Sequence, residues 1–159
     1  MAGRFGLAGP FPNDATLALG TGEVTLLELT AAYAAFANGG LRPEPRGIAS
    51  ARADGRSLAL PAPVLTRALA AEPAREVRRM LDAVVARGTG RAAQPPGGRA
   101  VAGKTGTTQD FRDAWFVGIA GGLVIGVWLG NDGGTPMAEV RGGTLPARLF
   151  RDIVEGMAP

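Results

Sequence analysis

The stretch AVAGKTGTTQDFRDAWFVGIAGGLVIGVWLG, residues 100 to 130, determines the fold class of this 159-residue chain. It holds three short runs of β-branched, aromatic and small residues, 100–106, 113–120 and 123–130, which are typical of strands. Gly121 and Gly122 separate the last two runs and predict a tight antiparallel hairpin. The stretch therefore predicts an antiparallel sheet, with Trp128 expected in its core.

Helical patterns lie on both sides of these strands. Thr25 and Glu28 form a capping box, and apolar residues then recur at helical spacing up to the stop at residues 38–40. A second amphipathic helix is predicted over 73–88, beginning at a proline and ending at a glycine. Apolar spacing over 149–157 predicts a third. Helices before and after an antiparallel sheet give an α+β fold, with the sheet flanked by helices.

The remaining segments carry turn and loop signals. Residues 1–20 are rich in glycine and proline and are expected to form an irregular N-terminal segment, followed by one structural unit over 21–159. Asp54 and Gly55 predict a two-residue hairpin turn. A short helix is predicted from Val64 to Ala71, and residues 87–99 are expected to form a loop.

Composition excludes several classes of function. The chain has no cysteine and no histidine, which removes thiolate catalysis, the commonest general base and the commonest metal ligand. We expect no metal and no cofactor. Sixteen arginines give a formal charge of only +3 and lie scattered among few aromatics, so no nucleic-acid partner is expected. No segment resembles a signal peptide, and no apolar run is long enough to span a membrane.

Lys104, the only lysine, is central to two competing interpretations. Gly98, Gly103, Lys104 and Thr105 have the spacing of the phosphate-binding loop of nucleotide hydrolases. That loop needs a buried strand before it and a helix that begins at the lysine. The residues leading into the motif include two prolines and two glycines, which disfavour the strand. Threonines and a glycine follow the lysine, which disfavours the helix. On a strand beside a cleft, the lysine could instead bind a carboxylate, with a backbone N–H stabilising an oxyanion.

A family resemblance favours the second interpretation. KTGTTQDFRDAWFVG, residues 104–118, resembles the third motif and following strand of class A penicillin-binding proteins, the bifunctional cell-wall synthases. LALGTGEVTLLELTAAYAAFANGG, MLDAVVARGTGRAA, GVWLGND and RGGTLPARLFRDI resemble other segments of the same domain, in the family's order. The resemblance implies a partial fold of the penicillin-binding-protein and serine β-lactamase type, with residues 21–159 as the C-terminal portion of a transpeptidase domain. It also implies a substrate-binding and oxyanion site at Lys104, Thr105, Gly106 and Thr107.

The nucleophile of that family is missing from this sequence. Its serine belongs to Ser-x-x-Lys, and Ser-x-Asn completes the site. The only serines are Ser50 and Ser57, and neither begins either motif. We therefore expect no catalytic residue in this chain, and no transpeptidase activity from it alone. A degenerate fragment acting as a scaffold or binding module remains an alternative.

The resemblance also implies partners and a location. The parent domain would act on the stem peptide of peptidoglycan, bind β-lactams and include an N-terminal half that supplies the serine. The parent protein would work in the periplasm, at the outer face of the inner membrane. Without further strands, one sheet edge is expected to stay open, so that the isolated chain folds marginally or associates.

Overall fold

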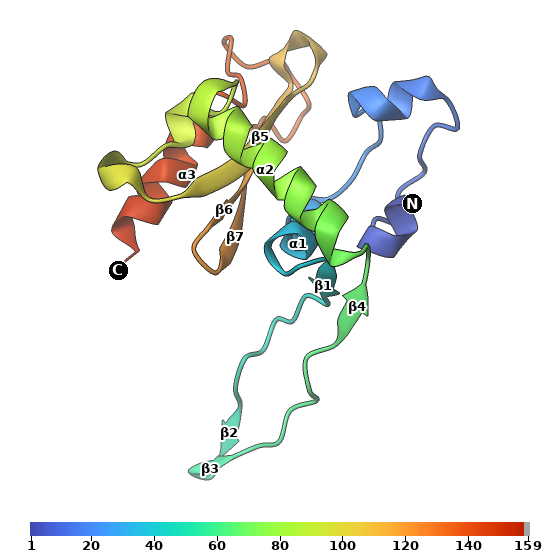
Figure 1. Cartoon of the computed structure of the whole chain (residues 1–159), viewed down its shortest axis with the longest axis vertical. Helices are drawn as coiled ribbons and strands as arrows, with labels where there is room; N and C mark the ends of the chain where they lie inside the picture. Colours follow the sequence, from blue (N-terminus) through green and yellow to red (C-terminus); the bar gives the residue numbers. More distant parts are fainter. Residues whose placement is uncertain (158–159) are drawn as a thin grey trace.

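A computed structural model describes residues 1–157; the last two residues of the predicted unit 21–159 lie outside the described residues. Figure 1 shows a body of helices around a sheet, a long arm below it and an N-terminal segment beside it. The central sheet has three antiparallel strands in the order β5 (Val101–Thr107), β6 (Asp113–Ala120) and β7 (Leu123–Gly130). The predicted sheet is confirmed, and Gly121 turns the β6–β7 hairpin with a φ of 57°.

Three α-helices cover this sheet: α1 (Leu26–Ala37), α2 (Ala71–Arg87) and α3 (Leu145–Gly156). The capping box predicted for α1 is present, because the Thr25 side chain accepts from the Glu28 N–H and the Glu28 carboxylate accepts from the Thr25 N–H. Helix α2 begins two residues before the expected proline. A proline is tolerated there because the first-turn N–H groups have no intrahelical partner. The α+β class is therefore confirmed.

Helices α1 and α2 pack on one face of the sheet, and α3 packs on the other, where Val85 of α2 also joins the core. On one face Ala102 and Ile119 contact Leu81 of α2, with Tyr33 of α1 packed alongside. On the other face Phe116 contacts Phe150 of α3, with ring centroids 4.9 Å apart. Burying large apolar side chains on both faces provides the main stabilisation of the sheet. The cluster on this second face, the α3-side cluster, consists of Val85, Ala93, Val101, Phe116, Ala120, Val127, Ala147, Phe150 and Val154.

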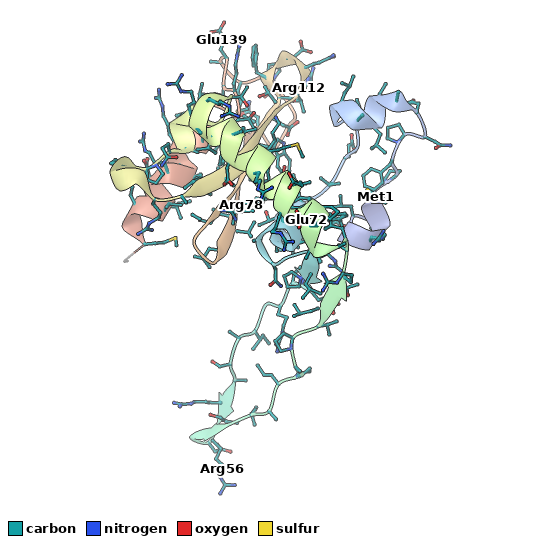
Figure 2. All side chains as sticks on the ribbon, in the orientation of Figure 1. Met1, Arg56, Glu72, Arg78, Arg112 and Glu139 are labelled. Carbon is teal, nitrogen blue, oxygen red and sulfur yellow. The ribbon has the colours of Figure 1, made fainter. Side chains whose placement is uncertain are left out.

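The arm between α1 and α2 extends away from the body (Figure 1). Its base is the pair β1 (Leu41–Pro43) and β4 (Leu65–Arg67), and its tip is the pair β2 (Arg52–Ala53) and β3 (Arg56–Ser57). The predicted turn is confirmed, with φ values of 49° at Asp54 and 75° at Gly55. Figure 2 shows Arg56 at the far end of the arm.

The short helix predicted from Val64 to Ala71 is wrong, because this segment forms β4. The Val64 carbonyl accepts from the Glu44 N–H at 3.0 Å, and Leu65 pairs with Pro43. The strand at 41–43 lies more than twenty residues away in sequence, so local propensity gave no sign of this pairing.

The other elements are short 3₁₀ turns. In the N-terminal segment they are η1 (Ala2–Phe5) and η2 (Ala15–Leu19). Around β5 they are η3 (Arg91–Ala93), η4 (Pro96–Gly98) and η5 (Gln109–Phe111). Within residues 1–157 no helix has both the length and the apolar character required to cross a bilayer.

Candidate functional site

Lys104 lies in the middle of β5, an edge strand of the sheet. It pairs with Val117 of β6, and the chain beyond it continues as strand to Thr107. The segment then turns through η5 into β6, so no helix begins at the lysine. The phosphate-binding-loop alternative is therefore wrong for this chain, because its anion site is the N-terminus of such a helix.

The predicted site residues divide between the two faces of β5. Successive side chains of a strand point to opposite faces. Lys104 and Gly106 share a face with their partners Val117 and Trp115, which line a cleft, whereas Thr105 pairs with Phe116 of the α3-side cluster. The lysine and the threonine side chains can therefore meet only around the strand edge.

The backbone of β5 opens toward that edge. The Thr108 N–H donates to the Asp113 carbonyl at 3.0 Å, which makes this opposed pair a hydrogen-bonded one. Antiparallel pairs alternate between bonded and non-bonded, so Thr105 and Thr107 fall in non-bonded pairs. Their N–H and C=O groups point away from β6. No strand pairs with this side of β5 in the described part of the chain, which leaves these groups available to an extended ligand.

The Lys104 ammonium reaches the same edge. Its Nζ donates to the Thr105 carbonyl at 2.9 Å and lies 3.5 Å from Thr105 Oγ1. Among residues 1–157, no carboxylate forms an ion pair with Lys104. An ammonium carries three donors, so this one keeps at least one donor for an anionic ligand.

A cleft of about 760 Å³ lies over this part of β5. Its far wall is formed by the N-terminal segment, by the stretch that leads into α1, including Glu23, and by Tyr33 of α1. Lys104 is the only cation among the described residues that line the cleft. Burial raises the pKa of the Tyr33 phenol, so the wall beside α1 carries a neutral hydroxyl at physiological pH. A Cβ at Gly106 would lie 3.2 Å from Trp115 Cβ, so a side chain at this position would crowd the cleft beside Trp115.

The two threonine hydroxyls have partners that the sequence did not predict. Thr105 Oγ1 lies 2.9 Å from Thr89 Oγ1, and Thr107 Oγ1 accepts from the Gly142 N–H at 3.1 Å. Thr89 belongs to the predicted loop and Gly142 to the glycine pair before α3. The only signal in the sequence for Thr89 and Gly142 is that both lie in segments that resemble the transpeptidase family, MLDAVVARGTGRAA and RGGTLPARLFRDI.

Trp128 also differs from its expected position. Its residue type predicts a place in the core, but its side chain is 36% exposed, and its indole N–H donates to Asp113 Oδ1 at 2.8 Å. The ring lies 6.3 Å from that of Trp115, its cross-strand partner. An indole buries its apolar body readily but places its N–H where it finds an acceptor.

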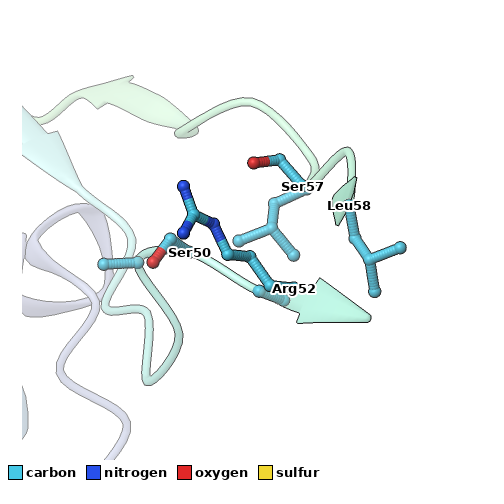
Figure 3. Close-up of a pocket in the computed structure, with 7 residues that line it drawn as sticks. Ser50, Arg52, Ser57 and Leu58 are labelled. Carbon is cyan, nitrogen blue, oxygen red and sulfur yellow. The ribbon is translucent and has the colours of Figure 1, made fainter. Parts of the chain in front are cut away.

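The two serines lie outside this site. They line a shallow hollow of about 490 Å³ on the arm, where Figure 3 shows Ser50 and Ser57 beside Arg52 and Leu58. An arginine stays protonated at all ordinary pH values, so it cannot take a proton from a serine hydroxyl. This hollow therefore lacks the base that an acyl-transferring serine needs.

An antiparallel sheet between helices, with Lys-Thr-Gly on its edge strand, is the arrangement expected of the serine acyl-enzymes that bind penicillin. The family model for the penicillin-binding protein transpeptidase domain matches residues 8–155. This chain belongs to that family.

Relatives from several bacteria agree with this assignment. The chain is 48% identical over 118 residues to penicillin-binding protein 1A of Aquifex aeolicus, covering 74% of this chain and 16% of that protein. It is 38% identical over 159 residues to penicillin-binding protein 1A of Neisseria meningitidis, covering 95% and 20%. The chain thus spans about a fifth of the length of the curated relatives it matches. These relatives confirm the resemblance to class A members.

Solved structures support the same fold. Penicillin-binding protein 1A from Haemophilus influenzae superposes with a TM-score of 0.82 at 24% identity, over 96% of this chain and 29% of that one. The PonA1 protein from Mycobacterium tuberculosis, in complex with penicillin V, superposes with a TM-score of 0.80 at 24% identity, over 99% and 49%. At this level of identity the likeness concerns the fold.

Proposed function

We propose that this chain supplies the carboxylate-binding and oxyanion-stabilising half of a D-alanyl-D-alanine transpeptidase site. The observation that carries the proposal is the placement of Lys104 at the open edge of β5, over a cleft and without a carboxylate partner in residues 1–157. Membership of the transpeptidase family supports the same interpretation.

In this proposal the terminal carboxylate of a stem peptide binds at the β5 edge. The Lys104 ammonium and the hydroxyls of Thr105 and Thr107 bind the carboxylate, and charge-assisted hydrogen bonds of this kind are the strong ones. The peptide then lies alongside β5 as an added strand, a common way of recognising extended peptides. Gly106 keeps the cleft side of the strand clear.

The chemistry needs a serine that this chain does not contain. A serine hydroxyl adds to the carbonyl carbon of the penultimate D-alanine, and the carbonyl oxygen becomes an oxyanion. The Thr107 N–H, directed to the open edge, donates to that oxyanion. The C–N bond then breaks, and the proton lost by the serine hydroxyl goes to the nitrogen of the departing D-alanine. A neighbouring amine next attacks the acyl–serine ester, takes the acyl group and loses a proton, which returns to the serine oxygen.

We propose that the serine comes from the N-terminal half of the domain, which joins this chain to complete the site. With it, the complete domain would bind β-lactams at the same serine. The solved complex of the PonA1 protein with penicillin V supports this expectation. A peptidoglycan substrate would place the activity outside the cytoplasmic membrane, in the periplasm of a cell with two membranes.

A titration followed by nuclear magnetic resonance tests the proposal on the chain as it exists. The ligand is a short acylated peptide ending in D-alanyl-D-alanine, and the amide signals of residues 104–107 are observed. We expect saturable shifts with a dissociation constant on the order of millimolar, corresponding to about −4 kcal/mol. Lys104→Met should weaken binding by about tenfold or more, the value of one hydrogen bond to a charged group.

Arg56→Met provides the matched control. It removes one positive charge at the exposed tip of the arm, far from the cleft (Figure 2). Its affinity should equal that of the unchanged chain. If both variants lose affinity equally, the ligand responds to net charge alone, and the proposed site is wrong.

A further inference from the structure

Thr89 is held in place by backbone contacts on both sides. It lies in the turn after α2, where the N–H groups of Gly88 and Gly90 both donate to the Val84 carbonyl at 3.0 Å. A Cβ at Gly90 would come within 3.3 Å of Phe116, so this residue packs directly on the core. The Thr89 side chain itself is exposed, and its hydroxyl lies 2.9 Å from that of Thr105.

The turn at Gly142 and Gly143 holds the second threonine. Gly142 donates its N–H to Thr107 Oγ1, and a Cβ on Gly142 would lie 2.3 Å from the Trp115 carbonyl oxygen. A Cβ on Gly143 would lie 2.5 Å from the Thr89 carbonyl oxygen. A side chain at Gly142 would therefore push this turn away from the sheet, and a side chain at Gly143 would push it away from Thr89. The turn thus sits directly against the segment of Thr89 and against β5.

These contacts determine what the two hydroxyls can do. A hydroxyl has one donor hydrogen and two acceptor lone pairs. The Gly142 N–H occupies a lone pair of Thr107 Oγ1 and leaves the hydrogen of that hydroxyl free. When the Thr89 hydroxyl is the donor of its pair, it occupies a lone pair of Thr105 Oγ1 and likewise leaves the Thr105 hydrogen free. Both threonines can then donate to one anionic group at the β5 edge.

We propose that Thr89 and Gly142 are positioning residues, which orient the hydroxyls of Thr105 and Thr107 toward the substrate carboxylate. This inference rests on the proposed function and adds the residues that act through the threonines. Neither positioning residue contacts the peptide in this scheme. Since Thr89 is exposed, its hydroxyl adds little to folding, and its loss should appear at the binding step.

Thr89→Val and Thr89→Ser form the matched pair for the first contact. The valine keeps the shape without a hydroxyl, and the serine keeps the hydroxyl. Two quantities are measured: the χ1 rotamer of Thr105 from three-bond couplings in the free chain, and the affinity for the acylated D-alanyl-D-alanine peptide. We expect Thr89→Val to average the Thr105 rotamer and weaken binding by about two- to tenfold, the range for one neutral hydrogen bond. Thr89→Ser should retain both values, with melting temperatures unchanged in both variants.

The second contact is tested at the amide of Gly142. Its hydrogen exchange should be protected in the unchanged chain and in Thr107→Ser, and faster by about tenfold in Thr107→Val, which lacks the acceptor. Unchanged exchange in Thr107→Val would remove Gly142 from the scheme.

The outcomes separate this inference from the function on which it rests. A fixed Thr105 rotamer in Thr89→Val, or an affinity equal to that of the unchanged chain, overturns the positioning role. If the unchanged chain does not bind the peptide, the proposed function fails and the inference fails with it. Weaker binding by Thr89→Val, with full binding by the unchanged chain and by Thr89→Ser, supports both.

Discussion

The contact between α3 and the sheet gives a prediction whose size follows from the structure. Phe150 is fully buried and packs against Phe116. Its replacement by alanine removes a core aromatic ring, which costs about 3–5 kcal/mol in the free energy of unfolding. Leu149, its neighbour on the same helix, is 43% exposed and provides the control. Leu149→Ala should cost about 1 kcal/mol or less.

A glycine beneath the ring makes the prediction more specific. A Cβ on Gly118 would lie 2.6 Å from Phe150 Cε2 and 2.8 Å from Phe116 Cε1. Gly118→Ala alone should therefore overpack the core and cost about 1–3 kcal/mol. In the Phe150→Ala background the two closest contacts of the added methyl group are gone, and the Phe116 ring has vacated space into which it can shift, so the cost should fall. We expect a coupling energy of about 1 kcal/mol or more between the two sites.

Urea unfolding followed by tryptophan fluorescence measures all four chains of this cycle. The cycle tests the register of β6 as well as its packing. A slip of one residue would place a neighbour of Gly118 under the ring and turn every side chain of the strand to the other face. Additive costs, or equal costs for Phe150→Ala and Leu149→Ala, would refute the packing and with it the pairing of Lys104 with Val117.

Three further predictions concern titration, acylation and association. Tyr33 is the only tyrosine, and burial raises its pKa, so phenolate absorbance should appear at higher pH in the folded chain than in urea. The free energy of unfolding that this neutral phenol contributes is present below about pH 10 and is lost as pH rises through the raised pKa. Identical titrations in the folded and unfolded chains would contradict this. A labelled penicillin should give no covalent adduct, because Ser50 and Ser57 lack a base; labelling of either serine would show that the chain carries a nucleophile after all. Strand β7 has no charged residue and no partner strand on its outer side in the described chain, so sedimentation should show association that Leu123→Lys reduces, and a monomer at all concentrations would count against it.

Local signals in the sequence predicted much of the fold. The capping box at Thr25, the turn at Asp54–Gly55 and the Gly121–Gly122 hairpin each depend on contacts within a few residues, and all three are present. The strand β4 depends on pairing with a distant segment, and the local pattern wrongly predicted a helix there. Residue type alone predicts a core position for Trp128, whereas its N–H partner Asp113 lies on another strand.

The candidate site shows the same division. The motif places Lys104 on a strand, and β propensity is enough to predict that. The separation of the lysine and the threonines onto two faces follows from alternation along the strand. Their side chains can still approach one ligand because β5 is an edge strand, and the local sequence does not predict that position in the sheet. The contacts of Thr89 and Gly142 join segments that local patterns treat as loops. Tertiary packing alone brings them to β5.

The proposed function requires the β5 edge to recognise a terminal carboxylate. Two ligands that differ only in that group allow a direct comparison: the acylated D-alanyl-D-alanine peptide with a free acid, and the same peptide with a C-terminal amide. We predict saturable shifts of the amide signals of residues 104–107 with the acid, and binding at least about tenfold weaker with the amide. Equal binding of the two peptides, or shifts confined to the arm, would contradict carboxylate recognition at β5.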